Sequence, residues 1–309
     1  AKEAQWNRAL ANLLSGRLQE GWRDFEARWS VPTSDVSSRR YEAPRWEGEA
    51  LTGRTILLHA EQGFGDTIQF VRFIPAIVAR GGEVVLESQP ALVPLLRTFP
   101  GVTKIVARGS PLPRFDLHTS LMSLPWLLGM TSDPAAGAPY LVSASRPVPI
   151  DVPQMPARQR IGLIWAGSAH HRADRLRSLP ADMLLRLTEG LLRRTGVVLL
   201  SLQIGPRSGE LHDHVRSGRI VDLAPELQDF ADTAAALSEL DLVVTVDTSV
   251  AHLAGAMGIP TWILLPYVPD WRWGLGRNDT PWYQSVRLFR QARAGDWLSV
   301  IDRIVTALP

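Results

Sequence analysis

The chain has no cysteine among its 309 residues, and lysine occurs only at positions 2 and 104. The lack of cysteine excludes a disulfide framework, a thiolate metal site and a thiol nucleophile. No apolar run approaches the ~18 uninterrupted residues of a membrane-spanning helix, and no signal-like segment opens the chain. A net charge of +2 gives no electrostatic reason to expect a nucleic acid or a membrane as partner. These absences are typical of a globular cytoplasmic protein.

Because lysine is so rare, nearly all of the 33 basic residues are arginine, the side chain best suited to forked contacts with phosphate. Genomic base composition explains the same bias equally well. A length of 309 residues favours two domains of ~100–150 residues each. The chain does not begin with Met and starts within a helical pattern, which suggests a piece of a longer protein.

Residues 4–29 carry an apolar pattern at helical spacing, interrupted at Gly16, which predicts two short antiparallel helices. The pattern resembles the latter part of a tetratricopeptide repeat, in which one repeat cannot bury its own apolar face. An unrelated helical hairpin packed on the main domain is the alternative. The residues that carry the pattern are Leu10, Leu13, Leu14, Leu18, Trp22, Phe25 and Trp29.

From Thr55 onward, apolar runs alternate with helical patterns, which predicts an α/β protein with parallel sheets. The Pro-rich residues 146–156 read as an extended linker between two such sets. Two doubly wound domains of this kind bind ligands at the carboxyl ends of their strands. The predicted strands are 55–60, 83–87, 104–107 and 116–119 before the linker, and 160–165, 197–203, 219–222, 242–246, 261–265 and 286–290 after it. A last helix is predicted over 297–308.

The most informative stretch runs from Val243 to Pro260, where a strand stops at Asp247 and a small-residue helix follows. Asp247 or Thr248 can cap that helix, and Ser249 and His252 lie in its first turn. The free N–H groups and the dipole of a helix start favour a phosphate. A structural helix with a buried histidine is the alternative interpretation.

A second turn signal, Gly63-Phe64-Gly65-Asp66, follows the first predicted strand. The two glycines allow a tight turn and a close approach of ligand to backbone. The spacing is not the dinucleotide fingerprint, because position 68 is Ile instead of Gly. Asp66 is either a helix cap or a carboxylate that accepts a proton from a hydroxyl group.

The second domain opens with Trp165-Ala166-Gly167-Ser168 and then a basic loop that contains Arg175 and Arg177. Ser168 and an arginine in such a loop suit a diphosphate, although a solvated loop has the same composition. Gln203, after the next strand, either reads a base or ribose or caps a turn. Asp229 or Asp232 is expected to be a helix cap first and a ligand contact second. The pair His212 and His214 has the wrong spacing for metal ligands on a helix, and no Asp-x-Asp pair is present to hold a divalent ion.

Taken in order, these motifs resemble bacterial tetratricopeptide-repeat glycosyltransferases. They are similar to the heptosyltransferases of glycosyltransferase family 9 and, more distantly, to the protein O-GlcNAc transferases. The residues that carry the resemblance are Glu61–Asp66, Trp165–Ser168 with Asp174–Ser178, Val246–Ala254, Pro269–Trp273 and Ser285–Gln291.

The resemblance implies a GT-B fold, a nucleotide-sugar donor held by the C-terminal domain, an acceptor at the N-terminal domain, and no required metal. Asp66 matches the carboxylate proposed as the base, and Thr248, Ser249 and His252 match the diphosphate-binding helix start. The lysine that heptosyltransferases place near the donor phosphates has no Lys counterpart here, so Arg175 or Arg177 would replace it. The O-GlcNAc transferases' own donor motif is not reproduced.

The function predicted is an inverting, metal-independent transfer of a sugar to a hydroxyl group of a protein, such as flagellin, or of a surface glycan. A nucleotide-sugar epimerase or hydrolase of the same fold, or a non-catalytic scaffold with a decayed transferase domain, remains open. The predicted organisation is a TPR-like hairpin (1–32), an N-terminal Rossmann-like acceptor domain (44–145), a linker (146–159), a C-terminal Rossmann-like nucleotide-sugar domain (160–296) and a last helix (297–309) able to cross back to the N-terminal domain. The predicted donor-binding residues are Gly63, Gly65, Trp165, Gly167, Ser168, Arg175, Arg177, Gln203, Asp247, Thr248, Ser249 and His252, with Asp66 catalytic.

Overall fold

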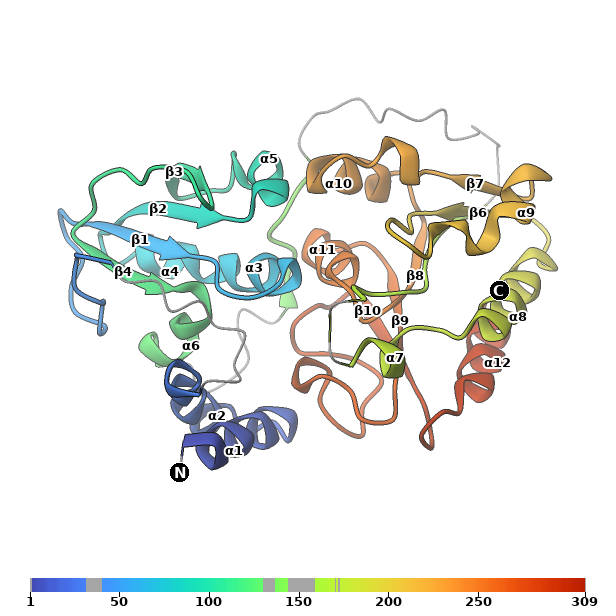
Figure 1. Cartoon of the computed structure of the whole chain (residues 1–309), viewed down its shortest axis with the longest axis horizontal. Helices are drawn as coiled ribbons and strands as arrows, with labels where there is room; N and C mark the ends of the chain where they lie inside the picture. Colours follow the sequence, from blue (N-terminus) through green and yellow to red (C-terminus); the bar gives the residue numbers. More distant parts are fainter. Residues whose placement is uncertain are drawn as a thin grey trace. The chain divides into compact units, whose positions relative to one another are not determined.

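A computed structural model describes residues 2–31, 41–129, 137–143, 159–169, 171 and 173–308. The chain divides into two compact units, Ala1–Ala136 and Gly137–Pro309. Each unit has its own parallel sheet, and both are drawn in Figure 1. Residues 33–40 and nearly all of the predicted linker 146–159 lie outside the described residues.

Unit 1 begins with the two predicted helices, α1 (Lys2–Leu14) and α2 (Leu18–Phe25), followed by the 3₁₀ turn η1 (Glu26–Ser30). The helices are antiparallel, since Trp6 near the start of α1 stacks 4.9 Å from Phe25 at the end of α2. Gly21 lets them approach closely, because a Cβ there would lie 2.6 Å from Leu13 Cδ2. The hairpin is therefore confirmed, while its likeness to a tetratricopeptide repeat stays a prediction.

The sheet of unit 1 has four parallel strands in the order β3-β2-β1-β4. The four strands predicted before the linker are all present. Their bounds are β1 Thr55–His59, β2 Glu83–Ser88, β3 Val102–Ala107 and β4 Leu117–Ser120. Four helices follow or connect them, α3 (Phe64–Phe70), α4 (Ile74–Val78), α5 (Val93–Leu96) and α6 (Leu124–Leu127), with short 3₁₀ turns at 71–73, 90–92 and 121–123.

Unit 2 has six parallel strands in the order β10-β9-β8-β5-β6-β7, again at the predicted positions. The bounds are β5 Gln159–Ile164, β6 Val197–Ser201, β7 Ile220–Asp222, β8 Leu242–Val246, β9 Thr261–Leu265 and β10 Val286–Arg290. The helices are α7 Asp174–Arg177, α8 Ala181–Leu192, α9 His212–Arg216, α10 Phe230–Ser238, α11 Ser249–Met257 and α12 Trp297–Ala307. Short 3₁₀ turns cover 208–211, 224–226 and 271–273.

The helices of unit 2 cover both faces of its sheet, as in a doubly wound fold (Figure 1). One face packs on α8 and α12 through a core of Leu, Ile and Val that includes Leu163, Leu187 and Ile304. The other face carries α10 and α11, whose many Ala residues are buried. Because the strands are buried on both faces, they read as nearly continuous apolar runs in the sequence.

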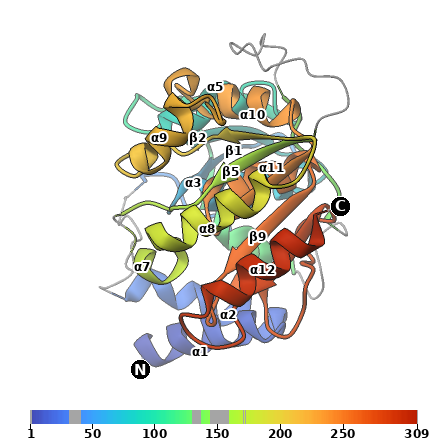
Figure 2. The ribbon, with the colours of Figure 1, turned by 90° about the vertical axis from the view of Figure 1, so that its right-hand side faces the viewer.

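Two further segments pack within unit 2. The last helix, α12, lies beside α8 (Figure 2). Gly190 of α8 makes this possible, since a Cβ there would lie 2.6 Å from Val305 Cγ2. The segment 137–143 also belongs to unit 2, because the N–H groups of Tyr140 and Leu141 bond to the carbonyl of Ala256.

Candidate functional site

The predicted donor-binding residues of unit 2 all follow neighbouring strands, β5, β6 and β8. In a parallel sheet the carboxyl ends of such strands meet at one edge, where ligands of doubly wound folds bind. The fold therefore gathers Gly167, Gln203 and Asp247 at the same edge, although they are far apart in the sequence.

Gln203 and Trp165 build the turn after β5. The side-chain oxygen of Gln203 accepts hydrogen bonds from the backbone N–H groups of Trp165 and Ala166, at 3.1 and 2.8 Å, and its amide nitrogen donates to the carbonyl of Ile204. The indole of Trp165 is fully buried and donates to Glu210 at 2.8 Å. Both side chains thus shape the turn, which favours the capping interpretation of Gln203.

The structure distinguishes Arg175 from Arg177, between which the sequence left open the cation near the donor phosphates. Arg177 lies against the turn, since a Cβ on Gly167 would meet its Nη2 at 2.5 Å. Its Nε is 3.5 Å from Asp174 Oδ1, and its side chain is only 15% exposed. Arg175 and Ser168 are exposed. Of these two arginines, Arg177 is therefore the one with a defined position at this edge of the sheet.

The start of α11 is organised as predicted, with Thr248 as its N-cap. The hydroxyl of Thr248 accepts from the N–H of Ala251 at 3.4 Å and contacts the hydroxyl of Thr245 at 3.2 Å. Ser249 is the first helical residue and is half-buried. The dipole of this nine-residue helix makes its start favourable for an anion.

Asp247 lies between the end of β8 and the start of α11, in an unusual electrostatic environment. Burial of its carboxyl group raises its pKa to about 6, and the charge of Asp270 acts in the same direction. Arg177 and Arg272 oppose this rise. Such a pKa indicates a carboxyl group that gains or loses a proton near neutral pH.

His252 is a core residue of the helix. It is 5% exposed, its ring stacks on Trp273 at 5.2 Å, and its Nδ1 lies 2.8 Å from the hydroxyl of Tyr283. This packing matches the alternative of a buried structural histidine. A direct contact between His252 and the donor stays an untested prediction.

Asp66 is in unit 1, in the first turn of α3. Its Oδ2 accepts a 2.7 Å hydrogen bond from the N–H of Gly63, the N-cap residue, so the carboxylate does cap the helix. A Cβ on Gly63 would lie 3.3 Å from Asp66 Oδ2, a tight contact. Asp66 and Gly65 are both half-exposed. The capping role is confirmed, and a catalytic role of the same carboxylate stays a prediction.

Sequence reasoning missed a buried polar network in unit 1. Glu61, two residues before Gly63, forms a bidentate ion pair with Arg28 of the N-terminal segment, at 2.6 and 2.7 Å. Gln89, after β2, donates to the carbonyls of Gln62 and Gly63. The only sequence signal was a charged residue directly after an apolar strand.

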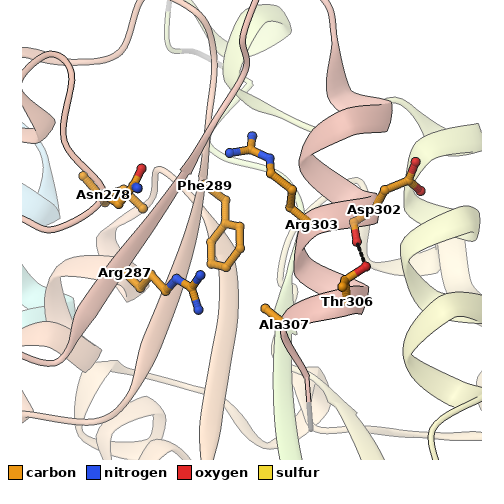
Figure 3. Close-up of a pocket in the computed structure, with 8 residues that line it drawn as sticks. Asn278, Arg287, Phe289, Asp302, Arg303, Thr306 and Ala307 are labelled. Carbon is orange, nitrogen blue, oxygen red and sulfur yellow. Dashed lines mark hydrogen bonds between the residues drawn. The ribbon is translucent and has the colours of Figure 1, made fainter.

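A cavity of about 470 Å³ lies between β10 and α12 (Figure 3), and none of the predicted site residues lines it. Its two arginines have other partners, since Arg303 donates to the carbonyl of Ser299 and Arg287 lies 4.8 Å over the ring of Phe289. We assign this cavity no functional role.

Among the described residues, no group of three or more His, Cys, Asp and Glu side chains is placed to hold a metal ion. The same part of the chain contains no helix long and apolar enough to cross a membrane.

A part of unit 2 that includes this edge of the sheet is similar to a known protein family. Residues 191–293, which include Gln203, Asp247 and the whole of α11, match the model of glycosyltransferase family 9 (heptosyltransferase). Residues 191–293 are thus similar to the glycosyltransferases of family 9. It is also 31% identical, over 336 aligned positions, to protein FlbA of Caulobacter vibrioides. That alignment covers 98% of the chain but 54% of FlbA, so the chain spans about half the length of this relative.

Two solved structures share the fold. A family 9 glycosyl transferase from Veillonella parvula matches with a TM-score of 0.65 and 13% identity, over 85% of this chain and 98% of that one. The ADP-heptose LPS heptosyltransferase II of E. coli matches with a TM-score of 0.58 and 13% identity, over 82% and 96%. The GT-B-type α/β fold is thus confirmed, and the glycosyltransferase prediction is supported by the family match. The likeness to O-GlcNAc transferases remains a prediction.

Proposed function

We propose that the chain transfers a sugar from a nucleotide-sugar donor to an acceptor hydroxyl group, with inversion and without a metal ion. One observation carries the proposal. Arg177, Asp247 and the capped start of α11 lie together at the carboxyl edge of a doubly wound sheet, in a chain of which residues 191–293 match the family 9 model. This combination of a helix start and a positioned guanidinium suits a diphosphate.

In this proposal unit 2 holds the donor. The backbone N–H groups at Thr248 and Ser249 and the hydroxyl of Ser249 bind the diphosphate, and Arg177 neutralises part of its charge. As the bond between the sugar and the diphosphate breaks, negative charge grows on the leaving oxygen, and these fixed donors stabilise it. They would supply the stabilisation that a metal ion gives in other transferases. ADP-heptose, which the E. coli relative's name specifies, is the first donor to test.

Asp66 is the proposed general base. The acceptor oxygen forms a bond to the anomeric carbon, its proton passes to the Asp66 carboxylate, and the nucleoside diphosphate leaves with the electrons of the broken C–O bond. The hydrogen bond from the N–H of Gly63 holds Oδ2 of Asp66. The acceptor, a protein such as flagellin or a surface glycan, is proposed from the resemblance of the N-terminal helices to tetratricopeptide repeats.

Thermal unfolding of the whole chain with ADP, UDP, GDP, CMP and their sugars tests the proposal. A ligand at ~100 times its Kd stabilises by about 2.7 kcal/mol, and each kcal/mol raises Tm by roughly 2–4 °C in a domain of 150–250 residues. We expect one nucleotide to raise Tm selectively, and its sugar to be the donor that is turned over. A chain that none of these compounds stabilises would contradict the proposal.

Replacing Gly167 by Ala examines the assignment of Arg177. The new methyl group would meet the guanidinium at 2.5 Å, and this flexible end of the side chain can move away at little cost in stability. We expect an unchanged Tm without ligand and a nucleotide affinity lowered about 10-fold, the order of one charge-assisted hydrogen bond. Gly209→Ala is the matched control, because nothing lies within 4 Å of a Cβ there. Equal nucleotide affinity of the two variants would remove Arg177 from the donor site.

A further inference from the structure

The loop that leads to Asp66 is tied to the N-terminal segment by a buried ion pair. Arg28 lies in the turn η1, directly after the helical hairpin, and is 0% exposed. Its Nε and Nη2 donate to the two carboxylate oxygens of Glu61 at 2.6 and 2.7 Å. Glu61 follows β1 and is 5% exposed, and its second oxygen also accepts from Ser120 of β4.

Arg28 is itself held rigidly. Its Nη1 donates to the Phe25 carbonyl and to Glu26, and its Nη2 donates to the hydroxyl of Ser123 at 2.9 Å. The rings of Phe25 and Trp29 each lie 4.7 Å from the guanidinium carbon. Every nitrogen of this guanidinium is therefore engaged, and its plane is fixed by aromatic rings.

From Glu61 the constraint passes along a very short segment to Asp66. Gln89 holds the next two residues through their carbonyls, at 3.0 Å for Gln62 and 3.2 Å for Gly63, and also accepts from Thr67 of α3. The N–H of Gly63 then bonds to Asp66. The backbone that leads to Asp66 is thus held by Arg28 through Glu61 and by Gln89 through two carbonyl groups.

The ion pair is not needed merely to attach the hairpin. Trp22 of α2 is buried and packs edge-on against Phe70 of α3, at 5.8 Å, which gives the hairpin an apolar contact with the same unit. Burying two charges is costly, and an apolar pair of similar volume often supports a fold equally well. A buried arginine at this point therefore calls for a role in specifying geometry.

We propose that Arg28 is a positioning residue, which holds the loop 61–63 and thereby sets the place of Asp66 for catalysis. The inference rests on the proposed function, since it takes Asp66 as the base. It makes the N-terminal helices part of the catalytic unit in addition to any role in binding partners. Misplacement of a catalytic group by ~1 Å can lower the rate about 10²-fold.

The test uses the whole chain with the double substitution Arg28→Met and Glu61→Met, which removes both charges and keeps apolar volume. The single variant Arg28→Met is measured beside it, because an unpaired Glu61 can unfold the protein. Asp24→Asn is the matched control, since it weakens the Arg8–Asp24 ion pair of the same hairpin, which does not contact Glu61. Tm, amide hydrogen exchange and release of nucleotide from the nucleotide sugar selected by the thermal panel are followed for each variant.

For the double variant we expect a Tm within a few degrees of the parent and amide exchange over residues 61–67 faster by about 10-fold or more. We also expect kcat to fall about 10²-fold, with KM for the nucleotide sugar within about twofold because Arg177 and the start of α11, to which the proposal assigns the diphosphate, lie in unit 2. Asp24→Asn should leave exchange over 61–67 and kcat near those of the parent.

A double variant that is stable, exchanges over 61–67 as the parent does and keeps its kcat would overturn the proposal. If the parent turns over no nucleotide sugar at all, the proposed function fails. Amide hydrogen exchange over residues 61–67 then tests by itself whether the ion pair holds the loop. Faster exchange in the double variant would still support the conclusion that Arg28 holds the loop 61–63, and unchanged exchange would refute it.

Discussion

Asp247 and Thr248 are neighbours in the chain, but the structure gives them different tasks. Thr248 caps α11 through its hydroxyl group, so the carboxyl group of Asp247 is not used as the cap. Burial and the charge of Asp270 instead raise the pKa of Asp247, and Arg177 and Arg272 act in the opposite direction. Charged side chains therefore dominate this part of the site. Single substitutions should separate donor binding from the sugar-transfer step.

Replacing Asp247 by Asn should change how stability depends on pH. The pKa of Asp247 is raised to about 6 in the folded protein, against about 3.9 in an unfolded chain. Its contribution to stability is thus complete below pH ~4 and is lost as pH rises through about 6. We expect Asp247→Asn to gain on the parent between pH 4 and 7, by on the order of 2 kcal/mol, in urea unfolding at a series of pH values. A difference that does not vary with pH would refute the raised pKa.

Asp66→Asn should separate the two roles of that residue. The amide oxygen of Asn can still accept the hydrogen bond from Gly63 and cap α3, but it cannot accept the acceptor's proton. We expect sugar transfer to fall about 10²–10⁴-fold, while the rise of Tm with nucleotide is unchanged. Transfer at the parent's rate would show that Asp66 is only a helix cap.

At the scale of the elements, helix starts are the best-defined features of the chain. In α10, Asp229 accepts from the N–H groups of Ala231 and Asp232, and Asp232 accepts in return from the N–H of Asp229. This reciprocal capping box satisfies several N–H groups that the helix itself leaves without partners. The expectation that Asp229 or Asp232 caps this helix is confirmed, and both carboxyl groups take part.

Asp229→Ala removes the cap of α10 without touching the proposed site. We expect a loss of about 1 kcal/mol, which corresponds to a Tm lower by roughly 2–4 °C, and a nucleotide affinity like that of the parent. Asp213→Ala is a suitable comparison, because Asp213 is exposed and pairs only weakly with Arg216 at 3.1 Å. Equal Tm values for the two variants would show that the cap contributes nothing measurable.

At the scale of the whole molecule, the proposed donor and acceptor functions belong to different units. Arg177, Asp247 and α11 are in unit 2, whereas Asp66 and its supporting network are in unit 1. Each unit has its own sheet and its own helices, so each can respond to its own ligand.

Hydrogen exchange with and without the selected nucleoside diphosphate should reveal this division. We expect slower exchange in the turn after β5 and in the first turn of α11, since the ligand's phosphates would bond to backbone N–H groups there. Exchange in β1 and over residues 61–67 of unit 1 should stay the same. Protection confined to unit 1 would place the nucleotide in the wrong unit and contradict the proposal.

The sequence alone predicted all ten strands, the hairpin helices, α12 and the capped start of α11. These features depend on local signals, namely continuous apolar runs, glycine breaks and short polar caps, which need no knowledge of distant contacts. The order of motifs along the chain also predicted the family whose model matches residues 191–293.

Only the tertiary structure decided which side chains come together. Arg177 rather than Arg175 packs on Gly167, His252 is buried against Trp273, and Arg28 reaches Glu61, 33 residues away. It also placed α12 on α8. Contacts of this kind depend on how elements distant in sequence pack, and the local pattern around an arginine or histidine is the same whether it faces solvent, a ligand or a buried carboxylate.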